Sequence, residues 1–101
     1  MSGLEPYRAQ LDEIDEQIVR LLGERFDVCR AVAEHKRQHD IPMMQPDRVT
    51  IVRQRYLARG AEVALPGAFT ASFFDLLIGA TCALEDELMG AGSAPAGETT
   101  A

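Results

Sequence analysis

The sequence predicts an all-α protein with three helices in the order long, short and medium. Apolar residues recur at steps of three and four along most of the chain, and no stretch shows the strict alternation of a strand. Prolines at positions 42, 46 and 66 divide the chain, because proline begins or ends a helix. At 101 residues the chain holds one domain. We expect that domain to span residues 1–89, followed by a disordered, low-complexity tail at 90–101.

The first predicted helix runs from Leu4 to about His39 and carries a stripe with coiled-coil-like spacing. The stripe consists of Leu4, Tyr7, Leu11, Ile14, Ile18, Leu21, Arg25, Val28 and Val32. A helix of this length measures roughly 54 Å, whereas a compact domain of this size has a radius of gyration of about 13 Å. One chain cannot cover such a helix, so we predict an oligomer, most simply a homodimer.

Two shorter helices are predicted after the first. The residue before Pro42 avoids the α region, which ends the first helix. Pro46 suits the first turn of a second helix, and Gly60 is interpreted as that helix's C-terminal cap. Pro66 marks the start of a third helix, whose apolar positions recur at helical spacing to about Met89.

The composition excludes several classes of protein. The net charge of −6 leaves no basic face for nucleic acid. We find no signal-peptide pattern and no apolar run of 18 residues, and so expect no membrane span. Cys29 and Cys82 lie in apolar helical patterns without metal-ligand spacing, which predicts reduced thiols in a cytoplasmic protein. His35 and His39 lack a third ligand, so we expect no metal there.

Arg25 occupies a position in the stripe where an apolar residue is expected. A buried arginine needs a partner, which is either a carboxylate of the protein, such as Glu85, or a ligand. Lys36 lies eleven residues later, about 20° around the helix and roughly 16 Å along it. Two cations on one face favour a polyanionic small molecule, because arginine binds carboxylates in a bidentate manner. The alternative for Lys36 is a solvated lysine at a helix end.

Four further polar residues border the same region. Arg8 lies about 25 Å from Arg25 along the helix, so it reaches the same pocket only from an antiparallel partner chain. Arg48 opens the second helix, and Thr81 and Glu85 share one face of the third. The alternatives are an exposed Arg8, a backbone-bonded Thr81 hydroxyl and a solvated Glu85. Since no nucleophile motif or phosphate loop accompanies this set, an enzyme built on it works by positioning and electrostatics.

The ordered set of these residues resembles the all-helical chorismate mutases, with their relatives isochorismate-pyruvate lyase and 4-amino-4-deoxychorismate mutase. The resemblance covers about residues 4–88 and rests on Leu4 and Arg8, Leu11-Asp12-Glu13-Ile14-Asp15, Leu21-Leu22-Gly23-Glu24-Arg25, Lys36, Ile41-Pro42 and Pro46-Asp47-Arg48-Val49. It implies an intertwined homodimer with two sites built from both protomers, a small dicarboxylate substrate and no cofactor. Some short members of the family dock on a larger pathway enzyme, and that arrangement stays open here.

The resemblance also implies a role for each site residue. Arg25 and the partner's Arg8 are expected to clamp the two substrate carboxylates. Lys36 is expected to bond the ether oxygen and a carboxylate, Arg48 to add positive potential, and Thr81 to hold a carboxylate.

Glu85 matches a position that hydrogen-bonds the ether oxygen, so Lys36, Glu85 and Arg25 are the residues expected to act on the reaction itself. A carboxyl group donates a hydrogen bond only when it is protonated. We therefore expect activity to fall as pH rises, and a Glu85→Gln variant to flatten that dependence.

Two positions depart from the family pattern. Val49 stands where chorismate mutases usually carry a glutamate that bonds the ring 4-hydroxyl, and Gln45 stands where an aspartate is common. The predicted function is a Claisen rearrangement of chorismate or 4-amino-4-deoxychorismate to prephenate or its 4-amino analogue. The alternatives are pyruvate elimination from isochorismate to give salicylate, and a non-catalytic helical dimer. The converging cations weigh against the last of these.

Overall fold

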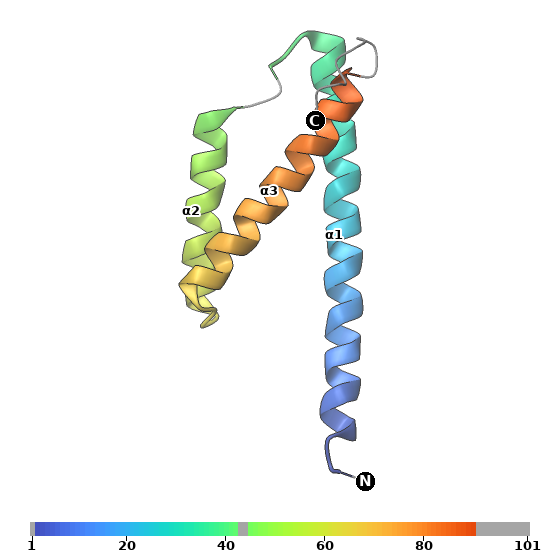
Figure 1. The fold of residues 1–101 in the computed structure, drawn as a ribbon, viewed down its shortest axis with the longest axis vertical. Coiled ribbons are helices and arrows are strands. Elements are labelled where there is room, and N and C mark those ends of the chain that lie inside the picture. Colours follow the sequence, from blue (N-terminus) through green and yellow to red (C-terminus); the bar gives the residue numbers. More distant parts are fainter. Residues whose placement is uncertain (1, 43–44, 91–101) are drawn as a thin grey trace.

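The computed structural model describes residues 2–42 and 45–90, and these residues form three helices (Figure 1). They are α1 (Glu5–His39), α2 (Pro46–Glu62) and α3 (Gly67–Gly90). The described residues contain no strand, which confirms the predicted all-α class. The tail predicted to be disordered begins at Gly90, the last residue of α3, and its remainder, residues 91–101, lies outside the described part of the chain.

The ends of α1 follow from local sequence. Glu5 lies in the first turn and Lys36 in the last, where each charge complements the helix dipole. The chain leaves the helix at Asp40, which adopts the left-handed conformation with φ 58° and ψ 39°. The backbone N–H of Asp40 donates to the Lys36 carbonyl, as in a left-handed helix cap. At 35 residues, α1 is roughly 52 Å long, close to the prediction.

The prediction that Gly60 caps α2 is wrong. The helix continues to Glu62, and Gly60 is a buried residue inside it. Thr70 of α3 lies directly against Gly60: a Cβ atom at residue 60 would be 2.8 Å from the Thr70 Oγ1 atom. The glycine therefore allows α2 and α3 to approach closely. The residue with a left-handed backbone conformation between these two helices is Ala64, with φ 62°.

A Gly60→Ala variant is expected to be less stable by about 1–2 kcal/mol. The added methyl group crowds a buried, β-branched side chain, and this overpacking outweighs the gain of about 1 kcal/mol in helix propensity. Chemical denaturation measures the change. Gly23→Ala is the matched control, because nothing lies within 4 Å of a Cβ there and the substitution should stabilise the protein. In a Thr70→Ala background the Gly60→Ala penalty should vanish; a penalty that persists would contradict the steric explanation.

Helix α3 joins the other two helices (Figure 1). It crosses α2 near one end and α1 near the other, whereas α1 and α2 do not contact each other within the described residues. Among the described residues, the buried apolar side chains are few: Phe74 and Leu77 of α3 and Ala33 of α1. The Tyr56 ring of α2 packs on the Phe74 ring with their centroids 4.9 Å apart. A chain with so small a core exposes much of its remaining apolar surface.

The N-terminal half of α1 extends beyond the other two helices (Figure 1). The apolar residues of its stripe are between 38% and 63% exposed. They are Leu4, Tyr7, Leu11, Ile14, Ile18, Leu21, Val28 and Val32. A row of large exposed apolar side chains, interrupted in this helix by Arg25, marks an interaction surface. The predicted homodimer remains a prediction, and this row is the surface on which it would form.

One segment of α3 is strongly apolar. Gly67–Leu88 is long and apolar enough, by length and composition alone, to cross a membrane. The statement that the chain has no such segment is therefore wrong. The segment's acidic residues include Asp75 and Glu85, which pair with Arg53 of α2 and Lys36 of α1. Since α3 is the one helix that packs on both others, the same composition also suits a core helix.

Candidate active site

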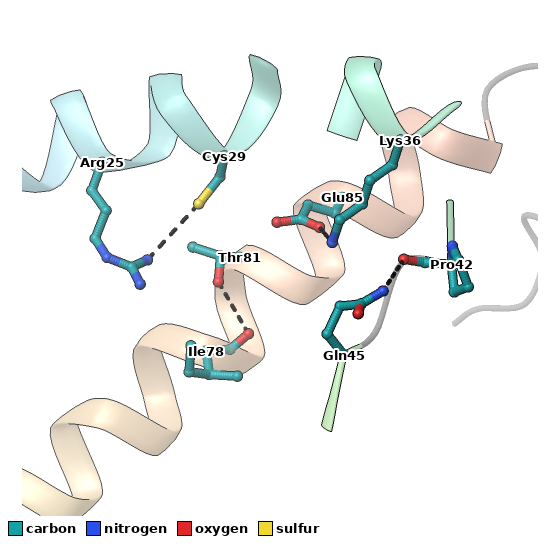
Figure 2. Close-up of polar contacts among 8 residues, drawn as sticks. All are labelled: Arg25, Cys29, Lys36, Pro42, Gln45, Ile78, Thr81 and Glu85. Atoms are coloured by element: carbon teal, nitrogen blue, oxygen red, sulfur yellow. Dashed lines mark hydrogen bonds and ion pairs between the residues drawn. The ribbon is translucent and has the colours of Figure 1, made fainter. Parts of the chain in front are cut away.

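Lys36 and Glu85 form an ion pair where α1 meets α3 (Figure 2). The Lys36 Nζ and Glu85 Oε1 atoms are 3.4 Å apart, and the two side chains are only 15% and 12% exposed. Neither residue is therefore solvated, and the alternatives considered for them are wrong. Two charges this far removed from water need each other, because an isolated buried charge is costly. The pair places a cation and a carboxyl group side by side at the crossing.

Arg25 lies on the same helix as Lys36, and its side chain points from α1 toward α3 (Figure 2). It is half-buried, and its Nη1 atom donates a hydrogen bond to the Cys29 Sγ atom at 3.8 Å. No carboxylate among the described residues forms an ion pair with Arg25, and Glu85 is engaged by Lys36 instead. The alternative of a salt bridge between Arg25 and Glu85 is therefore wrong. The guanidinium keeps its charge available to an anionic ligand.

Thr81 is buried on α3, one turn before Glu85. Its Oγ1 atom donates to the carbonyl oxygens of Leu77 at 3.1 Å and Ile78 at 3.2 Å. This is the backbone-bonded arrangement considered as the alternative for Thr81. To donate to a ligand carboxylate, the hydroxyl must turn away from its own helix.

The remaining candidates come from the start of α2 and from the N-terminal end of α1. Gln45 precedes α2, and its Nε2 atom donates to the Pro42 carbonyl at 3.2 Å (Figure 2). Arg48 is exposed and Val49 half-buried in the first turn of α2. Arg8 is exposed near the N-terminal end of α1. The structure therefore brings Arg25, Lys36, Thr81 and Glu85 to the α1–α3 crossing and does not bring Arg8 of the same chain to them.

Cys29, for which the sequence predicts only a reduced thiol, also lies in this region. Both cysteines are free, as predicted. Burial raises the pKa of the Cys29 thiol, although the positive charge of Arg25 acts in the opposite direction. Burial likewise raises the pKa of Cys82, and the negative charge of Glu85 adds to that effect. Arg25 and Cys29 are four residues apart, so the sequence alone already places them on the same face of α1.

Comparison with known proteins identifies the family. The family model described as chorismate mutase type II matches residues 7–86. The chain belongs to the type II chorismate mutases. It is thus an isomerase of the chorismate mutase type, as the resemblance implied. No solved structure matches the chain.

Two relatives of this mutase cover most of its length. It is 37% identical over 92 residues to a 4-amino-4-deoxychorismate mutase of Streptomyces pristinaespiralis. This match covers 91% of this chain and 71% of the relative. It is 34% identical over 86 residues to a 4-amino-4-deoxychorismate mutase of Streptomyces venezuelae, covering 85% and 84% of the two chains. A third relative, 33% identical over 63 residues, is a bifunctional chorismate mutase/prephenate dehydratase of Aquifex aeolicus; the match covers 62% of this chain and 17% of that protein. None of the three is an isochorismate-pyruvate lyase.

Proposed function

We propose that this mutase converts 4-amino-4-deoxychorismate into the 4-amino analogue of prephenate, in preference to chorismate. The two relatives with the broadest coverage bear the name of that activity. The observation that carries the proposal is Val49, half-buried in the first turn of α2. An aliphatic side chain there lacks the carboxylate that chorismate mutases usually offer to the 4-hydroxyl, so this wall is not built for chorismate. Val49 accepts from neither substituent, and the residue that distinguishes the amine from the hydroxyl is Gln45.

Gln45 supports the amino substrate. Its Nε2 atom is engaged by the Pro42 carbonyl, which leaves Oε1 as the acceptor that this amide offers to a ligand. An amino group brings more N–H donors than a hydroxyl brings O–H donors, so an amide oxygen favours the amine.

The chemistry needs positioning and electrostatics rather than a cofactor. In a Claisen rearrangement the ether C–O bond breaks as a new C–C bond forms, and negative charge grows on the ether oxygen. The enzyme accelerates this step by selecting the folded conformer and stabilising that charge. In the proposed site, Arg25 binds a substrate carboxylate and the Lys36 ammonium turns from Glu85 toward the ether oxygen. A hydrogen bond from Glu85 to the same oxygen, and the fall of activity with rising pH expected from it, stay predictions.

We infer that the second carboxylate is bound by Arg8 of the partner subunit. A groove of about 830 Å³ lies between α1, α2 and α3, lined by apolar side chains such as Tyr56 and Phe69. Arg55 and Arg59 also line it. The exposed stripe of a second α1 is apolar, as is most of the groove lining. Acidic residues at positions 12, 13, 15 and 16 flank that stripe, and their charge is opposite to that of the two arginines of the groove. An antiparallel partner helix would carry its own Arg8 toward Arg25.

Two further expectations belong to this proposal. The free thiols of Cys29 and Cys82 support a cytoplasmic enzyme, because reducing compartments keep cysteines unpaired. Docking of the dimer on a larger pathway enzyme is supported by the bifunctional relative, in which a mutase region is joined to a second enzyme.

Steady-state kinetics with 4-amino-4-deoxychorismate, chorismate and isochorismate test the proposed substrate. We expect kcat/KM for the amino substrate to exceed that for chorismate by at least about tenfold, and no salicylate from isochorismate. Val49→Glu should raise kcat/KM for chorismate by about tenfold, because the 4-hydroxyl gains an acceptor. Val19→Glu, which adds the same charge at an exposed position, is the matched control. Chorismate turned over as well as the amino substrate by the unmodified enzyme would refute the preference.

A further inference from the structure

The contact that holds Arg25 in place is not an ion pair. In the described part of the chain, the polar contact of its guanidinium is with the Cys29 thiol, one helical turn later on α1 (Figure 2). The carboxylate of Glu85, which would be the natural partner, is held by Lys36 at 3.4 Å. A long and flexible side chain thus points toward α3 beside a neutral sulfur atom.

A thiol suits this position better than the common alternatives. A carboxylate four residues after an arginine forms an ion pair with it and cancels the charge that a substrate carboxylate needs. An alanine makes no polar contact and leaves the rotamers of the arginine unrestrained. Sulfur is a weak hydrogen-bond acceptor, so it steers the guanidinium without competing strongly against a carboxylate ligand.

We propose that Cys29 is a positioning residue for the rearrangement: its neutral thiol holds the Arg25 guanidinium toward α3 and leaves it able to bind a substrate carboxylate. This inference rests on the proposed function, because it takes a substrate carboxylate to be the ligand of Arg25. Cys29 itself acts through Arg25 and does not take part in bond making or breaking.

The role requires that the thiol stay protonated. Burial raises the pKa of Cys29, so at neutral pH the sulfur is uncharged. The charged and titratable groups around it are Arg25, Arg30 and Lys36 on α1, which oppose the shift, and Glu85 and Cys82 on α3. When pH rises through the raised pKa, a thiolate forms, pairs with Arg25 and adds a negative charge that faces a dianionic substrate. KM should therefore increase on the alkaline side.

Kinetics from about pH 7 to about pH 10 with 4-amino-4-deoxychorismate test the proposal. Cys29→Ala should raise KM about fivefold at neutral pH and change kcat less than twofold, roughly the effect of one weak hydrogen bond. Cys29→Ser should recover most of that loss, whereas Cys29→Asp should lower kcat/KM about 100-fold because its carboxylate neutralises Arg25. The alkaline rise of KM should disappear in the Ala and Ser variants and persist in Cys82→Ala, the matched thiol deletion.

A second measurement does not depend on turnover. The thiolate absorbance of Cys29, titrated in the Cys82→Ala protein, should report a higher pKa when Arg25 is also replaced by alanine, because the thiolate loses its neighbouring cation. The positioning role would be overturned if the Cys29 pKa were the same with and without Arg25. It would also be overturned if the Cys29→Ala enzyme kept the parent's KM and its rise at alkaline pH. Absence of turnover of all three substrates by the unmodified enzyme would instead refute the proposed function, and the titration would still decide whether Cys29 and Arg25 interact.

Discussion

Replacing Arg25 by alanine is expected to lower kcat/KM for the rearrangement by about three orders of magnitude. The variant would lose the proposed charge-assisted, bidentate interaction with a substrate carboxylate in a half-buried position. The fold should be unaffected, because Arg25 forms no ion pair with a carboxylate of the described chain. Loss of the diene absorbance measures the rate, and thermal unfolding and sedimentation measure the fold and the oligomer.

Arg20→Ala is the matched control for this experiment. Arg20 lies on the same helix, and its ion pair with Glu24, at 3.7 Å, is solvent-exposed. Exposed pairs of this kind contribute only about 0–1 kcal/mol, so activity and stability should stay close to those of the parent. An Arg25→Ala enzyme whose kcat/KM stays within about threefold of the parent value would show that the carboxylate is bound elsewhere.

Mixing two inactive variants is expected to restore activity if each site is shared between two protomers. Arg8→Ala and Arg25→Ala should each be nearly inactive alone. In a mixed dimer, the protomer that carries Arg8→Ala keeps its own Arg25 and receives Arg8 from its partner, so one of the two sites is intact. Random reassociation after unfolding and refolding together should then recover about one quarter of the parent activity.

The control for this experiment mixes Arg25→Ala with Lys36→Ala. Both residues belong to the same protomer's part of the site, so each site of the mixed dimer lacks one of them and no activity should return. Recovery in the control, or none in the Arg8 and Arg25 mixture, would rule out the proposed division of the site. Sedimentation of each mixture shows whether dimers have formed, which separates a failure of assembly from a failure of the shared site.

Local sequence was sufficient to predict where the helices lie. The predicted start and end of α1 differ from the observed ones by one residue or less, and Pro46 begins α2 as expected. Proline is rare inside helices, so it marks where they begin and end, and the spacing of apolar residues identifies the buried face of each helix. Both signals depend only on residues close together in the sequence. The error at Gly60 has the opposite cause. Residue 60 must be a glycine because Thr70 of α3 packs against it, and the sequence around residue 60 contains no sign of that contact.

The candidate site divides in the same way. The 3.6-residue period of the helix placed Arg25 and Lys36 on one face of α1, and Thr81 and Glu85 on one face of α3, from sequence alone. It left open which cation meets the carboxylate. The structure pairs Glu85 with Lys36 at 3.4 Å and leaves Cys29 as the contact of Arg25.

The sequence by itself therefore determined the helices, their faces and the family to which the chain belongs. Only the tertiary structure decided that Lys36 rather than Arg25 pairs with Glu85, and that a thiol rather than a carboxylate accompanies Arg25. The physical reason is that side-chain periodicity is a property of one helix. The pairing of charges across two helices depends on where those helices cross, and that point is fixed by the packing of α3 against α1.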